Sequence, residues 1–309
     1  MTALDAVSVY TPAFRVPIED LADPLGLTDI QVRLFRRFHG LDQVRFAPDR
    51  SPGELLRAAV EGLAELRGQE HRVRYVIHGR AMPVVVPYPH NPLHDVCRQL
   101  GLGHALAFTV TQQSCASGLL AVELAGRLLA GDPDENALAL VLTGEKAFTR
   151  HARLIPGTSL FGEGASACLV SANGPRDRML SFVCAQRGDF DGEFGDREEE
   201  FQRQYRPSLA EVINRAVADA GLTLDDIRLV LPHNVNVVTW QRLCSLMGFP
   251  VQRVLLSNVP DHGHLFCTDA FANYRTARER DLLREGDHYL VATVGAGAGA
   301  TFSAMVFQH

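Results

Sequence analysis

The sequence predicts an α/β protein whose two related halves pack as a five-layered αβαβα sandwich. Three observations predict this fold. First, the order helix, strand, helix, strand, helix, strand occurs twice along the chain. Second, the predicted strands are continuous apolar runs, which is typical of parallel strands in sheets covered on both faces. Third, each half contains a long third helix that suits a central layer, where a helix is apolar on nearly all sides.

The first half of this pattern runs from residue 54 to residue 144. Helical spacing of apolar residues predicts helices at 54–66, 92–102 and 115–132. Buried strands are predicted at 75–79, 104–112 and 137–144. Gly131 follows the last helical turn, where a glycine is typical of a helix end.

The second half repeats the order from residue 208 onward. Helices are predicted at 208–221, 238–250 and 267–287, and strands at 227–233, 251–258 and 288–295. A Gly-Asp pair follows the long helix in both halves, at 131–132 and at 286–287. The repeated order therefore divides the chain into an N-terminal half, 1–175, and a C-terminal half, 176–309.

Composition narrows the class of protein. The 309 residues are 46% hydrophobic and 21% charged, a composition typical of a globular protein. The formal net charge is −6, and acidic and basic residues are mixed along the chain, so we expect no nucleic-acid partner. The six cysteines are scattered without a CxxC pair, which argues against a disulfide framework and a zinc ribbon. We see no signal-peptide pattern and no apolar run of the ~18 residues that a membrane span needs, and therefore expect a cytoplasmic protein without membrane attachment.

Cys115 is the first candidate for chemistry, because it follows the small and polar run TVTQQS and opens an apolar helix. Such a thiol could be a packed core residue, a metal ligand or a nucleophile. The helix N-terminus stabilises a thiolate, which favours the nucleophile. The corresponding turn of the second half carries His262 and His264, and His233 ends that half's first strand. Open α/β sheets place their sites at such strand ends.

Five segments, in order, resemble the 3-oxoacyl-ACP synthase III branch of the thiolase superfamily. They are the early arginine-bearing segment FRRFHGLDQVR, the nucleophile segment QQSCASGLLAVELA, the glycine-rich LFGEGASACLVS, the PHNVN segment and the C-terminal VGAGAGATFSAMV. The resemblance spans nearly the whole chain. It implies a thiolase-type sandwich, a homodimer and an acyltransferase activity.

The resemblance also assigns site residues. It places Cys115 at the nucleophile, His233 at the histidine of the family's HQAN motif and Asn236 at its asparagine. His264 stands where the family usually has the asparagine of a GNT motif, so the implied site is Cys-His-His. A Gly-His motif followed by an aspartate, here Asp269, resembles relatives that act as acyltransferases in specialised metabolism.

The implied reaction loads an acyl group from a thioester onto Cys115. Backbone N–H groups of Cys115 and Gly297 would stabilise the tetrahedral oxyanion. His233 and His264 would then stabilise the enolate of a malonyl thioester in a decarboxylative Claisen condensation. The alternative is transfer to a hydroxyl or amine with one histidine as general base. A non-catalytic partner subunit is a third reading, against which the retained cysteine and histidines argue.

The expected substrates are thioesters of coenzyme A or of an acyl carrier protein, with no permanently bound cofactor. Arg36, Arg37 and Arg45 lie in the early segment and suit a phosphate of coenzyme A or of the carrier's phosphopantetheine arm. A metal at His262, His264 and Cys267 is not expected, because their spacing matches no common zinc pattern.

Overall fold

Nine strands form the central framework of the computed structural model, which describes residues 2–150, 152–190, 198–297 and 299–309. A first set of strands comprises β1 (Ala3–Tyr10), β4 (Val73–Gly79), β5 (Leu106–Val110), β6 (Leu138–Glu145) and β9 (Gly164–Ser171). A second set comprises β10 (Arg178–Arg187), β11 (Ile227–Pro232), β12 (His288–Gly297) and β13 (Gly299–Gln308). No helix among the described residues is both long enough and apolar enough to cross a bilayer.

The strand order repeats between the two sets. The first set runs β5-β4-β6-β9-β1 and the second runs β11-β12-β13-β10, so β4, β6, β9 and β1 correspond to β11, β12, β13 and β10. Pairing agrees as well, since β4–β6 and β11–β12 are parallel and the other corresponding pairs are antiparallel. The predicted duplication is confirmed. The chain passes from one set to the other between β9 and β10, while the exact division at residue 175 stays a prediction.

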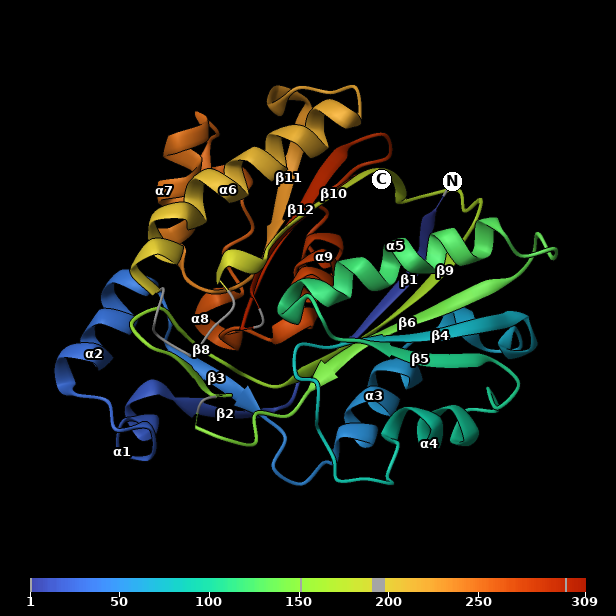
Figure 1. The fold of residues 1–309 in the computed structure, drawn as a ribbon, viewed down its shortest axis with the longest axis horizontal. Helices are drawn as coiled ribbons and strands as arrows, with labels where there is room; N and C mark the ends of the chain where they lie inside the picture. Colours follow the sequence, from blue (N-terminus) through green and yellow to red (C-terminus); the bar gives the residue numbers. More distant parts are fainter. Residues whose placement is uncertain (1, 151, 191–197, 298) are drawn as a thin grey trace.

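Helices complete five layers (Figure 1). Outer helices α3 (Pro52–Glu61) and α4 (Pro92–Gln99) cover the first set of strands, and α6 (Glu198–Asp219) and α7 (Val237–Met247) cover the second. The central helices are α5 (Ser117–Ala130) and α9 (Asp269–Glu279). One buried cluster joins Val122 of α5 and Phe271 of α9 to Val141 and Val291, which belong to different strand sets. This shared core confirms the predicted αβαβα sandwich.

Three element predictions were wrong in detail. The expected strand 251–258 is a 3-10 turn at Val251–Arg253 followed by a single bridge between Val254 and Val230, because the chain bends away from β11 at the edge of the sheet. The helix expected from residue 208 begins at Glu198 and continues through the exposed Pro207. The helix expected to end near residue 287 ends at Glu279.

Short elements close the end of the sandwich where Cys115 lies. They are β2 (Phe14–Pro17), α1 (Ala22–Leu25), α2 (Asp29–Leu34), the π-helix η2 (Phe35–His39), β3 (Gln43–Phe46), β7 (Leu154–Ile155), β8 (Ser159–Leu160) and α8 (Val259–His262). Their apolar side chains form a cluster that includes Phe35, Leu160, Phe161 and Phe266 and that also contains Cys115. Cys115 therefore packs in an apolar environment built largely from the segments outside the two repeats.

Candidate active site

Cys115 lies in a 3-10 turn, Ser114–Ala116, directly before α5. Ser114 has a φ of 49°, a left-handed conformation that non-glycine residues adopt rarely. Cys115 is 7% exposed. The turn packs against β12, where Thr293 Oγ1 donates a hydrogen bond of 3.4 Å to the Cys115 carbonyl. A Cβ on Gly295 would lie only 1.9 Å from the Gln113 carbonyl oxygen, so a glycine is required for this approach of two backbones.

His264 is held by backbone bonds to the glycine-rich segment that the sequence singled out. Its N–H donates to the Leu160 carbonyl at 2.9 Å, and its carbonyl accepts from the Gly162 N–H at 3.0 Å. The Phe161 ring stacks on the imidazole with centroids 4.7 Å apart. A Cβ on Gly162 would lie 2.4 Å from the His262 carbonyl oxygen, which explains the glycine. The segment therefore positions His264 by backbone and ring contacts.

Asp269 fixes the imidazole from behind. Nδ1 of His264 hydrogen-bonds to Oδ2 of Asp269, and both side chains are buried. The carboxylate also accepts from the Leu265 N–H at 2.7 Å and from the Asn234 N–H at 2.5 Å. Asp269 is the first residue of α9, and a helix N-terminus favours a negative charge. Because Nδ1 of His264 is hydrogen-bonded to Asp269, Nε2 is the ring nitrogen free to act on a substrate.

The Cys115 side chain also interacts with His264. Burial lowers the pKa of His264, but the Asp269 carboxylate and the Cys115 side chain outweigh it and raise that pKa to about 10. Cys115, His264 and Asp269 are therefore arranged as a candidate nucleophile, base and orienting carboxylate would be in an acyl-transfer site.

His233 also reaches the site, as predicted, and its ring centroid lies 6.2 Å from that of His264. Its environment is different. Nε2 is 2.5 Å from the hydroxyl of Tyr205, and Nδ1 is 3.4 Å from the Ala292 carbonyl oxygen. Burial, followed by the charge of His264, lowers the pKa of His233 to about 3. The pKa values of the two neighbouring histidines are thus shifted in opposite directions.

Asn236 caps the N-terminus of α7. Its Oδ1 accepts from the Thr239 N–H at 2.7 Å and caps α7, and its Nδ2 donates to the Thr158 carbonyl at 3.1 Å. The backbone N–H of its neighbour Asn234, a residue that was not predicted, binds Asp269 and so links the two histidine-bearing turns. Tyr205 was not predicted either, because nothing local in the sequence relates α6 to His233.

The three arginines expected at a phosphate differ in availability. Arg45 is 9% exposed, forms an ion pair with Asp261 and donates to the Pro12 carbonyl at 2.9 Å. Arg36 pairs with Glu19 and Asp42. Arg37 is exposed and has no side-chain partner among the residues that the structure describes. The expectation that Arg45 binds a phosphate is therefore wrong, because Arg45 is already paired with Asp261 and a phosphate would have to displace that carboxylate.

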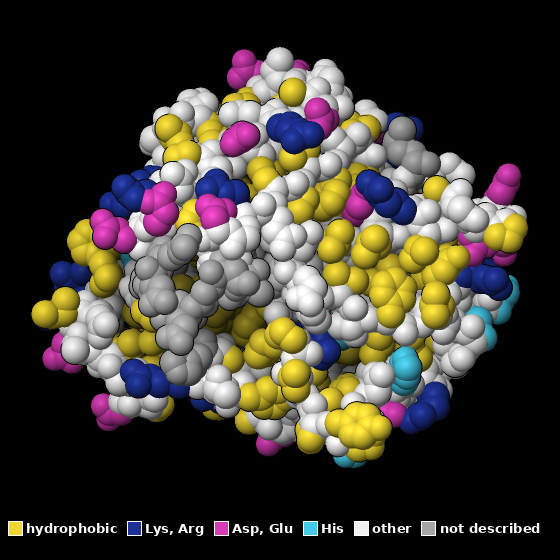
Figure 2. All heavy atoms as spheres, in the orientation of Figure 1, with side chains coloured by type: hydrophobic (Ala, Val, Ile, Leu, Met, Phe, Trp, Pro, Cys, Tyr) yellow, Lys and Arg dark blue, Asp and Glu magenta, His cyan; other side chains and the backbone are white. Residues whose placement is uncertain are grey.

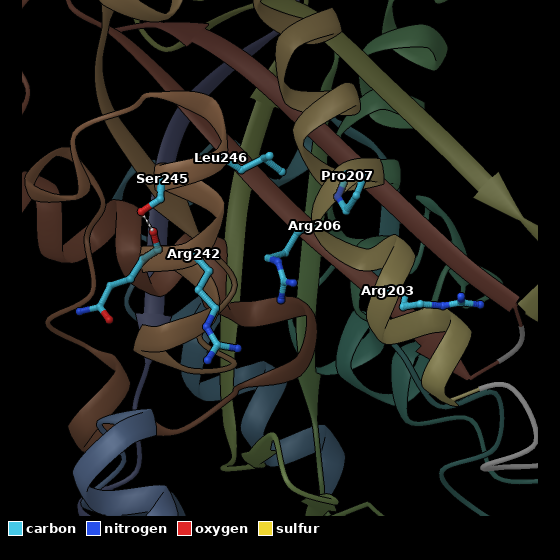
Figure 3. A pocket seen from close by; sticks show the side chains of 7 residues that line it. Arg203, Arg206, Pro207, Arg242, Ser245 and Leu246 are labelled. Atoms are coloured by element: carbon cyan, nitrogen blue, oxygen red, sulfur yellow. Dashed lines mark hydrogen bonds between the residues drawn. The ribbon is translucent and has the colours of Figure 1, made fainter.

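A different arginine cluster surrounds a cavity of about 600 Å³ between α6 and α7. The lining includes Arg203 and Arg206 of α6 and Arg242 of α7. Figure 3 shows the side chains of Arg206 and Arg242 extending in the same direction from the two helices. Neither pairs with a carboxylate among the described residues. The cluster escaped sequence reasoning because two helices that are separate in the sequence contribute to it.

Comparisons with known proteins show which proteins this chain resembles. The model for the C-terminal part of 3-oxoacyl-[acyl-carrier-protein] synthase III matches residues 217–309. A beta-ketoacyl-[acyl-carrier-protein] synthase III of Nitratidesulfovibrio vulgaris is 27% identical over 317 residues, covering 93% of this chain and 92% of that protein. The chain is thus similar to 3-oxoacyl-ACP synthase III proteins over most of its length.

Solved structures show the same fold for this synthase III-like chain. The synthase III of Thermus thermophilus superposes with a TM-score of 0.82 at 22% identity, covering 99% of both chains. ChlB3, described as an acyltransferase, superposes with a TM-score of 0.85 at 20% identity and covers 99% of this chain and 97% of its own. The thiolase-type fold expected from the sequence is thus confirmed.

Two further expectations concern backbone donors and metals. Gly297 ends β12 and pairs with Gly299, two residues beyond the glycine that contacts the nucleophile turn. Its role as an oxyanion donor stays a prediction. Within the described part of the chain, no three His, Cys, Asp or Glu side chains are grouped so that they could hold a metal ion.

Proposed function

We propose that this protein is an acyltransferase that loads an acyl group from a thioester onto Cys115 and passes it to a hydroxyl or amine acceptor. One observation carries the proposal: His264 lies between the Cys115 side chain and the Asp269 carboxylate. This connected chain supplies what two-step acyl transfer needs, a nucleophile and a proton carrier held in one orientation.

In the first step, the Cys115 sulfur attacks the thioester carbonyl and a tetrahedral oxyanion forms. Backbone N–H groups of Cys115 and Gly297 are the proposed donors to this oxygen, and losing one such donor typically costs ~10²–10³ in rate. Collapse of the intermediate breaks the bond to the leaving thiol, which takes its proton from His264. The acyl group is then bound to Cys115 and His264 is neutral.

In the second step, neutral His264 takes the proton of the acceptor as the acceptor attacks the acyl carbonyl. Acylation favours this role, because it removes the interaction with the Cys115 side chain that helps to raise the pKa of His264. Asp269 keeps the ring oriented and stabilises the imidazolium that forms. Collapse of the second intermediate releases the ester or amide and restores the Cys115 sulfur.

Decarboxylative condensation is the second candidate, and the names of the relatives favour it, since several are beta-ketoacyl synthases. Condensation needs donors for the enolate oxygen of a malonyl thioester. His233 is close enough to His264 to serve as one, but its Nε2 is occupied by the Tyr205 hydroxyl. We therefore rank plain transfer first, although the sequence alone slightly favoured condensation.

The proposed donors are thioesters of coenzyme A or of an acyl carrier protein. Both carry a phosphate on the pantetheine arm, and the cavity lined by Arg203, Arg206 and Arg242 supports binding of such a group. Arg37 is a further candidate contact, as it is exposed on η2, which packs against α7. No permanently bound cofactor is part of the proposal.

A homodimer is also part of the proposal, together with a cytoplasmic location. The edge strand β5 exposes Leu106, and the loop after β4 exposes Val84 and Tyr88. Figure 2 shows hydrophobic side chains gathered over α5, where Leu124 and Leu128 are only partly buried. An open strand edge beside apolar side chains supports pairing with a second copy. A non-catalytic partner subunit is less well supported, because it would not need the assembled residues of the site.

Incubation with acyl-CoA and acyl-carrier donors, followed by intact-mass measurement, tests the first step. We expect the mass of one acyl group on the protein, and its absence with every donor would contradict an acylating enzyme. Carbon dioxide release from a malonyl thioester then separates the two reactions. Release at the rate of turnover would favour condensation, whereas acylation without release, followed by ester or amide formation, supports transfer.

A further inference from the structure

Tyr205 contacts His233 from α6, outside the chain formed by Cys115, His264 and Asp269. Its hydroxyl lies 2.5 Å from Nε2 of His233. Two rings hold the phenol in place, Phe201 at 5.6 Å and 89° and Phe302 at 6.1 Å and 72°. Burial raises the pKa of Tyr205, so the phenol stays protonated. The hydroxyl is therefore a fixed neutral group at the one ring nitrogen of His233 that could face a substrate.

The direction of this hydrogen bond follows from the other ring nitrogen. Nδ1 of His233 lies 3.4 Å from the Ala292 carbonyl oxygen, which can only accept, so Nδ1 carries a proton. The ring is neutral, since burial and the nearby His264 lower its pKa to about 3. Nε2 is then unprotonated, and the Tyr205 hydroxyl must be the donor. In this state His233 has no N–H to offer a substrate oxygen.

Condensation would need such an N–H. Decarboxylation of a malonyl thioester breaks the bond between the carboxylate and the α-carbon, releases carbon dioxide and places the electron pair on the enolate. The enolate carbon then attacks the acyl carbonyl and expels the Cys115 sulfur. Charge on the enolate oxygen must be stabilised by hydrogen-bond donors. With Nε2 of His233 engaged by Tyr205, His264 is the one of the two histidines left to donate to this oxygen.

We propose that Tyr205 is a specificity-determining positioning residue, whose hydroxyl occupies Nε2 of His233 and thereby withholds the second donor that a malonyl-derived enolate requires. The inference rests on the proposed acyl-transfer function and explains why the site would favour acyl transfer over condensation. The bond from Nδ1 to Ala292 is long. Without the phenol, the ring can therefore give up that bond and carry its proton on Nε2, facing a substrate oxygen.

Two variants separate the hydroxyl from the ring. Tyr205→Phe removes the hydrogen bond and keeps the ring, whereas Tyr205→Ala also opens the space in front of Nε2. We expect carbon dioxide release from malonyl-ACP to rise from background by ~10² in Tyr205→Ala, the worth of one oxyanion donor, and by less in Tyr205→Phe. Tyr274→Phe is the matched control, because it removes a buried hydroxyl that donates to Asp177 outside the site.

A spectroscopic measurement tests the proton assignment directly. In the wild-type protein labelled with ¹⁵N-histidine, Nε2 of His233 should resonate as an unprotonated nitrogen that accepts a hydrogen bond. A signal typical of a protonated ring nitrogen would overturn the inference, as Tyr205 would then accept.

The kinetic outcomes are distinguishable. If the wild type transfers acyl groups without releasing carbon dioxide and the folded, acylated Tyr205 variants release none either, the inference about Tyr205 is wrong while the proposed function stands. If the wild type itself releases carbon dioxide during turnover, the proposed transfer function fails, and with it the inference.

Discussion

Cys115 and Cys267 occupy equivalent positions in the two halves of the protein. Each follows a residue with positive φ, Ser114 at 49° and Phe266 at 53°, and each lies in a 3-10 turn that leads into a central helix. The duplication has thus placed two thiols at the mouths of α5 and α9. Their surroundings decide that only one of them is suited to react.

Cys267 is enclosed by the turn of the other half. Its sulfur donates to the Ser114 carbonyl at 3.4 Å, and the Gly118 backbone hydrogen-bonds to it. Burial, then the charges of Glu145 and Cys115, raise the pKa of Cys267 well above its usual value, which keeps it a thiol. Cys115 instead lies beside His264. Cys267 is therefore a packing contact between the central helices.

The first prediction compares the two cysteines. Cys115→Ala should abolish acylation while the fold is retained, since losing one small side chain at a turn costs at most a few kcal/mol. Cys267→Ala should still be acylated. Peptide mapping of the acyl-enzyme checks both, and a label on Cys267 in the wild type would reverse the assignment.

The second prediction concerns the orienting carboxylate. Asp269→Asn keeps the shape of the side chain but removes the charge that holds Nδ1–H of His264 and stabilises the imidazolium. We expect acyl transfer to slow by ~10²–10⁴. Single-turnover kinetics measure the effect, and thermal unfolding controls for lost stability. Unchanged kinetics in a folded variant would mean that Asp269 serves the fold alone.

The third prediction tests the contact between β12 and the nucleophile turn. Gly295→Ala places a Cβ against the Gln113 carbonyl, so we expect a loss of ~1–3 kcal/mol in the free energy of unfolding and slower acylation of a displaced Cys115. Gly103→Ala is the control, because a Cβ there meets nothing within 4 Å. Equal behaviour of the two variants in denaturant titrations and acylation assays would exclude this contact as a constraint.

The fourth prediction concerns acid stability. Burial depresses the folded-state pKa of His233 from 6.5 to about 3, so between these values the unfolded chain binds the extra proton. The contribution of His233 is present above pH 6.5 and is lost as the pH falls toward 3, by at most ~1.4 kcal/mol per pH unit. His233→Gln should therefore lose stability less steeply in this window. Urea titrations from pH 7 to pH 4 check the slopes, and parallel curves would show that His233 is charged in the folded protein.

The fifth prediction concerns the arginine cavity. Arg206→Glu combined with Arg242→Glu should raise KM for the acyl donor by ~10–100-fold, the worth of a hydrogen bond to a charged group, with little change in kcat. Arg215→Glu, on the same helix α6, reverses one charge away from the cavity, half the charge change of the double variant, and should leave KM unaltered. Steady-state kinetics at two salt concentrations measure KM for each variant. An equal rise in KM for Arg215→Glu and for the double variant would show a general electrostatic response and not binding in the cavity.

The sequence by itself determined the layered fold and the position of the candidate nucleophile. Strand and helix order, the apolar strands and the duplication are recorded in local patterns of burial, which short stretches of chain carry. Cys115 could be identified because its helix mouth is also a local feature. His233 could be placed at a strand end and His264 in the turn before the last long helix, with the family resemblance adding their roles.

Only the tertiary structure decided how these groups are partnered. Asp269 joins His264 and Asn234, Tyr205 takes Nε2 of His233, and Arg45 is held by Asp261, and only the bond between His264 and Asp269 joins near neighbours in the sequence. The edge segment after α7 likewise keeps one bridge where a strand was expected. Charge state and hydrogen-bond direction depend on which groups share a desolvated space, and that is set by packing between elements, which no local pattern contains.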